Sequence, residues 1–273
     1  MSTSSPRTAM DAHAPLTAAV AGAWTVAAFQ LRRLLTRPRL ALAACGALFP
    51  AAVMLAVERA SRGRLDEDLT VAMLYALIPE AVCMLGLLVT MCPAVADELE
   101  RGTWVHVAVR PGGRQALLLG TTIAAVTWTA LVAATATLVA LAVTPLRDPL
   151  AVGRILLALV LVSCVGRAAL FALPAVIMPK RALVASVGVA LVVEYLAGAI
   201  PAIVNQATVS LRLRSLLVAW MGWERTLPTE AQLFVDPQPT WVHLLAVGIL
   251  VTVLLTAAVM ILERRQFPPS DEL

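Results

Sequence analysis

Two ionisable residues lie far inside long apolar runs of this chain, where a charge is costly. Arg167 falls within RILLALVLVSCVGRAALFALPAVI, and Glu194 falls within ALVASVGVALVVEYLAGAI. A charged side chain at the centre of a membrane helix costs at least ~2.5 kcal/mol, so it needs a partner. Counted from Lys180 and Arg181 between the two runs, both charges lie at a similar depth, roughly 18–20 Å at about 1.5 Å per residue. We expect Arg167 and Glu194 to form an ion pair, which either fixes two neighbouring helices or lines a path between them.

Other residue types that carry chemistry are scarce or scattered. The three histidines fall in separate regions, without HExxH or another metal-binding spacing. The chain has no GxSxG nucleophile motif and no GxxxxGK[ST] phosphate loop. Its four cysteines lie singly in apolar runs, with no CxxC pair, which argues against a disulfide or metal role. The sequence therefore predicts no catalytic residue, no metal site and no cofactor bound by this chain.

The composition indicates which elements position the buried charges. Of the 273 residues, 60% are hydrophobic and 14% are charged, and the mean hydropathy is +0.86. A soluble domain is about half apolar and about a quarter charged. The formal net charge of +4 is small and dispersed, so nucleic acid is not an expected partner. We therefore predict an all-α, polytopic membrane protein.

Apolar runs long enough to cross a bilayer predict six transmembrane helices in a single membrane domain, residues 14–262. About 20 apolar residues cross the hydrocarbon core, and only a helix satisfies every backbone group within its own segment. The predicted spans are residues 40–57, 70–95, 116–143, 155–178, 183–204 and 241–262. Residues 1–13 are small and polar and are expected to be disordered, and residues 263–273 form a tail.

Residues 14–36 are expected to form a helix that lies in the membrane interface. Their apolar part is short for a span, and Trp24, Ala28, Leu31 and Leu35 recur at helical spacing before a basic cluster. The alternative is a simple extension of the first span. Basic residues flank the ends of the first, fourth, fifth and sixth spans, so the positive-inside rule places both termini in the cytoplasm. The expected location is the cell inner (plasma) membrane.

The densest charge between two apolar runs is ADELERGTWVHVAVRPGGRQALLLG, residues 96–120. Gly102 can end the helix that leaves the membrane, and Thr103 can cap a short helix after it. Pro111, followed by two glycines, is a turn signal before the next helix starts. The predicted result is a compact cytoplasmic loop joined rigidly to spans two and three.

The pattern D-E-L-E-R-G-T, followed by R-P-x-x-R-x-x-L-L-L-G, resembles the signature of the permease subunits of ABC type-2 exporters. The interfacial helix, the six spans and the basic tail are similar to that family in outline. The sequence departs from the family pattern at Thr121, where lysine is usual. The matching positions are Glu98, Glu100, Gly102, Thr103, Pro111, Arg114, Leu118, Leu119 and Gly120.

The resemblance implies a non-catalytic permease that pairs with a second copy or a paralogue and exports a substrate. A separate cytoplasmic ABC ATPase would bind ATP and Mg, and it would dock on a coupling helix after Thr103. Asp97, Glu98 and Glu100 would then face basic or polar groups of the ATPase; alternatively, they only cap a helix end in a solvated loop. Membrane lipid is the other expected partner. The alternative function is a secondary transporter or channel-like subunit that is not coupled to an ATPase.

Two further features carry weaker expectations. In residues 205–240, SLRLRSLLVAWMGW places leucines and tryptophans on one helical side, which predicts a helix resting on the outer interface. A short strand and a lid over the path are the alternatives there. Glu80 follows Pro79 in the second span, and we expect it to face a wet outer vestibule.

Overall fold

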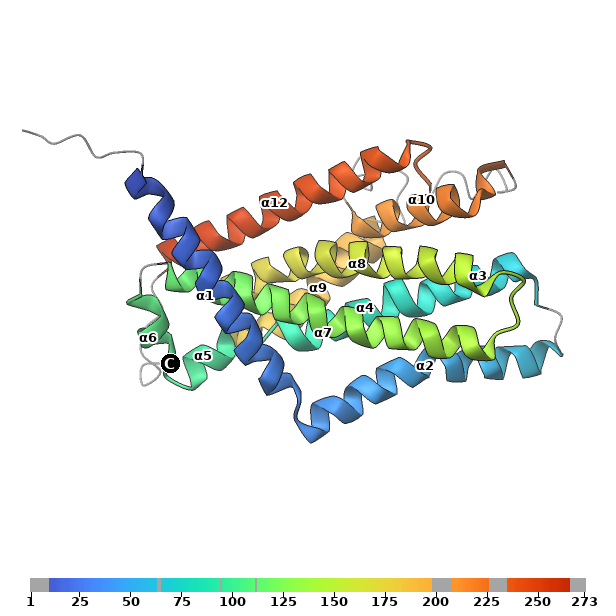
Figure 1. The fold of residues 1–273 in the computed structure, drawn as a ribbon, viewed down its shortest axis with the longest axis horizontal. Helices are drawn as coiled ribbons and strands as arrows, with labels where there is room; N and C mark the ends of the chain where they lie inside the picture. The colour runs from blue at the N-terminus through green and yellow to red at the C-terminus, as the bar shows by residue number, and fades with distance from the viewer. Residues whose placement is uncertain are drawn as a thin grey trace, which may run out of the picture.

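The computed structural model describes residues 10–62, 65–93, 95–110, 112–197, 208–225 and 235–265. Every regular element in these ranges is a helix, as the predicted all-α class requires (Figure 1). Five helical runs are long and apolar enough to cross a membrane. They are α2 (Arg37–Ser61), the continuous run of α3 (Glu67–Tyr75), η1 (Ala76–Val82) and α4 (Cys83–Met91), α7 (Gly113–Val143), α8 (Pro149–Ile177) and α12 (Thr240–Arg264).

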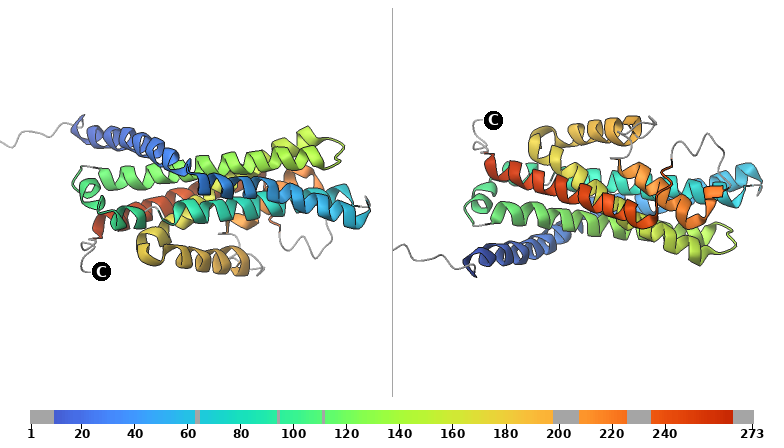
Figure 2. Two further views of the ribbon diagram at one scale, coloured as in Figure 1. Left: turned by 90° about the horizontal axis from the view of Figure 1, so that it is seen from below. Right: turned by 90° about the horizontal axis from the view of Figure 1, so that it is seen from above.

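These five runs lie along one long axis, with α8 among the others (Figures 1 and 2). One end of the bundle holds α5 (Ala96–Glu100), α6 (Trp104–Ala108) and the C-terminal end of α12. We call it the loop end, because the charged loop between α4 and α7 lies there. The far end holds the connections from α2 to α3 and from α7 to α8. Leu156, Leu159 and Phe171 of α8 are fully buried, so α8 is the central helix around which the core is built.

Small residues let the helices of the bundle approach closely. Ala133 and Ala136 of α7 are fully buried against the core. An atom added as Cβ to Gly120 of α7 would lie 2.6 Å from the carbonyl oxygen of Ala23 in α1 (Met10–Leu34). Such contacts are how membrane helices pack without a hydrophobic driving force between them.

Helix α1 crosses α7 obliquely at the loop end (Figure 1). Ala23 and Ala27 are buried, whereas Trp24 and Phe29 are exposed on the other side of the helix. The helix predicted over residues 14–36 is therefore present, and it begins earlier, at Met10. Residues 1–9 of the segment predicted to be disordered lie outside the described residues.

The span predicted over residues 183–204 is described only in part. Helix α9 (Ala182–Val189) continues into η3 (Ala190–Ala197), and residues 198–204 lie outside the described ranges. Figure 2 shows this helix to one side of the bundle. Leu183, Val184 and Val192 are exposed on it. Five of the six predicted spans thus correspond to helices of spanning length.

Helix α10 (Val209–Met221) corrects the expectations for the segment before the last span. Residues 209–221 form a helix and not a strand, because the Thr208 hydroxyl accepts from the Leu211 N–H at 3.2 Å and starts the first turn. The helix does not rest on the surface: Leu213 and Leu216 are fully buried, and α10 packs against α8 and α12. Helix α10 therefore belongs to the bundle, and it occupies the half toward the far end (Figure 1).

Candidate functional site

The predicted charges Arg167 and Glu194 come together in the middle of the bundle. Arg167 of α8 is 0% exposed, and its Nη2 lies 3.5 Å from Glu194 Oε2 in η3. Glu80 of η1 also contacts Nη2 and is the closer of the two carboxylates. The other oxygen of Glu80 accepts from the Tyr75 hydroxyl at 2.6 Å. Glu80 therefore does not face an open vestibule, and the site holds one guanidinium and two carboxylates. We call the side chains of Arg167, Glu80, Glu194 and Tyr75 the central cluster.

Both carboxylates of the central cluster project from π-helical turns. A π-helical turn is rare and re-aims the side chains that it carries. In η1 the ring of Pro79 provides no N–H for the helix. The Pro79 carbonyl accepts from Arg167 Nη1 at 2.5 Å and from Ser163 Oγ at 2.6 Å. Side chains of α8 thus satisfy the irregular backbone of η1, and they hold Glu80 toward the guanidinium.

Glu194 also fixes the start of α10. Its carboxylate accepts from the N–H groups of Val209 at 3.1 Å and Ser210 at 2.9 Å, and from Ser210 Oγ at 2.7 Å. The first N–H groups of a helix have no partner within the helix, and the helix dipole favours a negative charge there. Arg167 Nη2 donates to Ser210 Oγ at 3.0 Å. The central cluster therefore ties η1, η3, α8 and the N-terminus of α10 together.

A second polar contact links α10 to the last span. Arg212 Nη1 lies 2.7 Å from Asp236 Oδ2 and 3.2 Å from His243 Nδ1. His243 Nε2 lies 3.1 Å from the Gln238 carbonyl, which can only accept. The proton of the neutral ring is therefore on Nε2, and Nδ1 accepts from Arg212. Arg212 lies in the segment 205–240 that was expected to rest on the outer interface, and sequence reasoning did not predict these partners.

At the loop end, the acidic residues of the predicted coupling loop are engaged within the chain. Glu98 is only 7% exposed, and its Oε1 lies 3.0 Å from Arg33 Nη1 of α1. Asp97 Oδ2 lies 3.1 Å from Nη2 of the same arginine. The Thr103 hydroxyl donates to the Glu98 carboxylate. Glu98 thus points into the chain, where Arg33 offsets its charge. Of the three acids, Glu100 is exposed.

The other loop residues define two short helices. Gly102 has a φ of +66°, a conformation that favours glycine, and it ends α5. Thr103 precedes α6, and its carbonyl accepts the first backbone bond of that helix, from His106 N–H at 3.1 Å. Its hydroxyl donates to the Glu98 carboxylate. Pro111 lies outside the described residues.

Arg114 joins the start of α7 to the end of α12. Its Nη1 donates to the carbonyls of Leu262 at 3.2 Å, Glu263 at 2.7 Å and Arg265 at 3.3 Å. A cation there satisfies the last carbonyls of α12 and the negative end of its dipole. The Arg114 guanidinium also stacks over the Trp104 ring of α6, with 5.6 Å to the centroid. One side chain thus connects α6, α7 and α12.

The outward side of the loop is open. Glu100, His106, Val109 and Arg110 are all exposed, and Val109 is 78% exposed. These exposed residues are open to contact with another protein, although a single exposed apolar side chain is ordinary on a surface.

The sequence gives no match in comparisons with protein-family models or with curated proteins. The likeness to exporter permeases therefore rests on the sequence pattern alone.

Proposed function

We propose that this chain is the membrane permease subunit of an ATP-driven (ABC) exporter. The observation that carries the proposal is the loop between α4 and α7. The motif residues in this loop gather into a compact unit, clamped to the membrane helices on its inward side and exposed on its outward side. This is the construction that a coupling element needs, because it must contact a partner and pass on its motion without deforming.

In this proposal, the contacts of Arg33 and Arg114 pass a displacement of the loop on to the helices. Arg33 connects α5 to α1, and Arg114 connects α6 and α7 to the end of α12. A Cβ added to Gly113, the first residue of α7, would lie 2.2 Å from the Val107 carbonyl of α6. The end of α6 and the start of α7 therefore leave no room to slide, and a displacement of the loop reaches α1, α7 and α12.

Several further parts belong to the same proposal. The chain has no phosphate loop, so ATP and Mg bind to a separate ATPase subunit. The loop end is cytoplasmic, as are both termini, and the span over 183–204 completes six crossings. A second copy or a paralogue completes the transport path. The exposed apolar face of α9 is one surface that such a copy could cover. A path lined by Leu, Val, Ala and Met suits hydrophobic or amphipathic substrates.

Co-purification with an ATPase tests the proposal. The chain is co-expressed with a candidate ABC ATPase and purified in detergent, as wild type and as Glu100→Arg/Val109→Asp. Both changed residues are exposed, so the variant should fold, whereas a change at buried Glu98 would confound binding with stability. We expect the wild type to retain the ATPase and the variant to lose at least about nine-tenths of it. That tenfold loss corresponds to about 1.4 kcal/mol.

Arg59→Glu, an exposed change in α2 toward the far end, is the matched control and should retain the ATPase. Gel filtration of each variant checks its fold. If the wild type retains no candidate ATPase, the exporter proposal fails, and a secondary transporter or channel-like subunit becomes the better account.

A further inference from the structure

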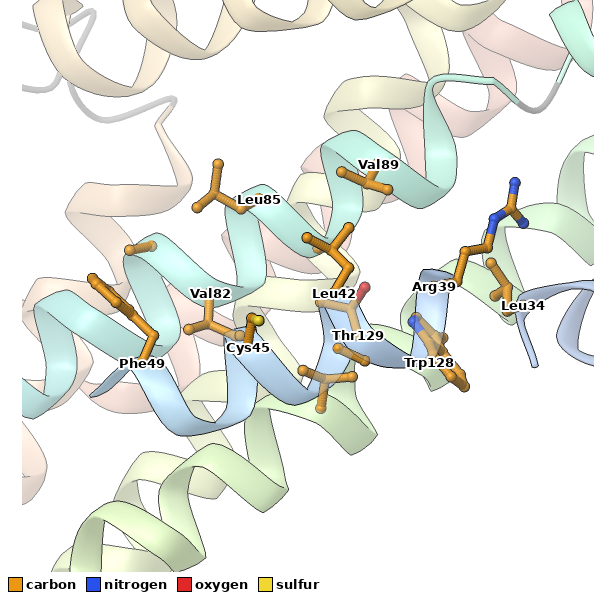
Figure 3. Close-up of a pocket in the computed structure, with 15 residues that line it drawn as sticks. Leu34, Arg39, Leu42, Cys45, Phe49, Val82, Leu85, Val89, Trp128 and Thr129 are labelled. Atoms are coloured by element: carbon orange, nitrogen blue, oxygen red, sulfur yellow. The ribbon is translucent and has the colours of Figure 1, made fainter. Parts of the chain in front are cut away.

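A groove lies between α2, α4 and α7, outside both the central cluster and the loop. It encloses about 350 Å³, and most of its lining is apolar (Figure 3). Leu42 and Phe49 of α2 form one side, and Leu85 and Val89 of α4 form the other. All four side chains are at least 44% exposed, so the groove is open along its rim. In a bilayer such a groove faces the acyl chains directly.

Two polar groups in the groove have no partner among the described residues. Arg39 lies at one end, near Trp128, and has no ion pair or hydrogen bond there (Figure 3). Thr129 is 1% exposed, and its hydroxyl has no hydrogen-bond partner in the described part of the chain. Thr121 and Thr137 of the same helix bond to the carbonyl four residues earlier, as helical threonines commonly do. Thr129 is therefore an unused donor in an otherwise apolar groove.

The length of the groove matches one leaflet. Arg39 and Phe49 are ten positions apart on α2, which is about 15 Å of helix. This is half of a hydrocarbon core that is ~30 Å thick. Gly46 packs against Val132, so Thr129 lies about one helical turn deeper than Arg39. The groove therefore presents a cation at its mouth, a hydrogen-bond donor one turn deeper and apolar side chains beyond. A phospholipid has its phosphate, ester and acyl chain in the same order.

We propose that this groove binds one anionic phospholipid from the leaflet at the loop end. Its phosphate lies on Arg39, an ester carbonyl accepts from the Thr129 hydroxyl, and an acyl chain runs between Leu42 and Leu85 toward Phe49. Charge complementarity selects an anionic lipid, because Arg32 and Arg37 are exposed near the same mouth and add to the positive field. Lipid binding does not depend on the proposed exporter function; only the assignment of the leaflet to the cytoplasmic side does.

Native mass spectrometry of the full chain tests the proposal, with phosphatidylglycerol and phosphatidylcholine of identical acyl chains as the probes. We expect one phosphatidylglycerol to be retained and to bind at least about tenfold more tightly than phosphatidylcholine. Both lipids carry the phosphate, but the choline cation of phosphatidylcholine is repelled by Arg39 and the positive field around it. Arg39→Gln should bind both lipids equally. Arg59→Gln removes an exposed arginine from the other end of α2, far from the groove mouth, and should keep the preference. Equal binding of both lipids by the wild type, or an unchanged preference in Arg39→Gln, overturns the proposal.

A second measurement locates the bound lipid. A phosphatidylglycerol with a photoreactive group in its acyl chain should label α2 between Leu42 and Phe49, and Ala43→Phe, which fills the groove, should abolish the label. Cys45 also lines the groove and is exposed. If two copies of the chain cross-link through Cys45 while the lipid label is absent, a second copy occupies the groove and the lipid proposal is wrong.

Discussion

Replacing Arg167 by methionine should strongly destabilise the bundle, and removing one carboxylate as well should restore part of the loss. The two Nη atoms of Arg167 contact acceptors on η1, η3, α8 and α10. Arg167→Met leaves the carboxylates of Glu80 and Glu194 without their cation, and the one proton of the Ser210 hydroxyl, which lies within reach of both, serves only one of them at a time. Breaking a buried ion pair by removing one partner costs about 3–5 kcal/mol. We expect the free energy of unfolding to fall by about that amount.

The double variant separates the charge effect from lost packing. Arg167→Met/Glu80→Gln has one buried carboxylate fewer, so it should be more stable than Arg167→Met by about 1–2 kcal/mol, which is a typical coupling between residues in contact. Glu80→Gln alone leaves a one-to-one pair of Arg167 and Glu194. It should therefore cost about 1.5–3 kcal/mol, the loss of one hydrogen bond to a charged group.

Unfolding in mixed micelles of increasing SDS content, followed by the fluorescence of the six tryptophans, measures all four proteins. The reasoning fails if Arg167→Met loses less than about 1 kcal/mol. It also fails if adding Glu80→Gln makes the Arg167→Met protein less stable, because the two carboxylates would then not be repelling each other.

Gly120→Ala should push α1 away from α7 and lower the free energy of unfolding by about 1–3 kcal/mol through overpacking. Gly248→Ala is the control, because nothing lies within 4 Å of an added Cβ there; it should be neutral or raise the free energy of unfolding by up to about 1 kcal/mol. Thermal unfolding in detergent compares the two, and equal melting temperatures would contradict the close contact. Arg33→Ala leaves Glu98 buried without its cation, so the free energy needed to detach α1 from the bundle should fall by about 1–3 kcal/mol. Protease cleavage of α1 should therefore become faster. Arg32→Ala changes an exposed neighbour and should be cleaved like wild type; similar cleavage of both variants would show that Arg33 does not hold α1.

The helical class and most spans could be predicted from the sequence because their cause is local. A run of apolar residues must form a helix in lipid wherever it lies in the fold. The spans predicted over 116–143 and 241–262 agree with α7 and α12 to within a few residues. The depth argument brought Arg167 and Glu194 to the same level for the same reason, since helix rise is constant.

The parts that sequence reasoning missed depend on tertiary partners. Glu80 turns toward Arg167 because a π-helical turn at Pro79 re-aims it, and that turn is satisfied by side chains of α8. Helix α10 was expected to rest on the outer interface because its leucines and tryptophans lie on one helical side. Arg212 is paired with Asp236, a partner from another segment. The Pro79–Glu80 dipeptide within an apolar run was the available signal for the first of these features.

The most direct test of the exporter account is a cross-link between the loop and the ATPase in native membranes. A cysteine introduced by Glu100→Cys, in a chain whose exposed Cys45 is replaced by serine, is treated with a short bifunctional maleimide. The account predicts a covalent product of this chain with the ATPase, whose yield changes when ATP is added, and no such product for Arg59→Cys toward the far end. No product at Glu100→Cys, or an equal yield from Arg59→Cys, would contradict the claim that this loop couples the chain to an ATPase.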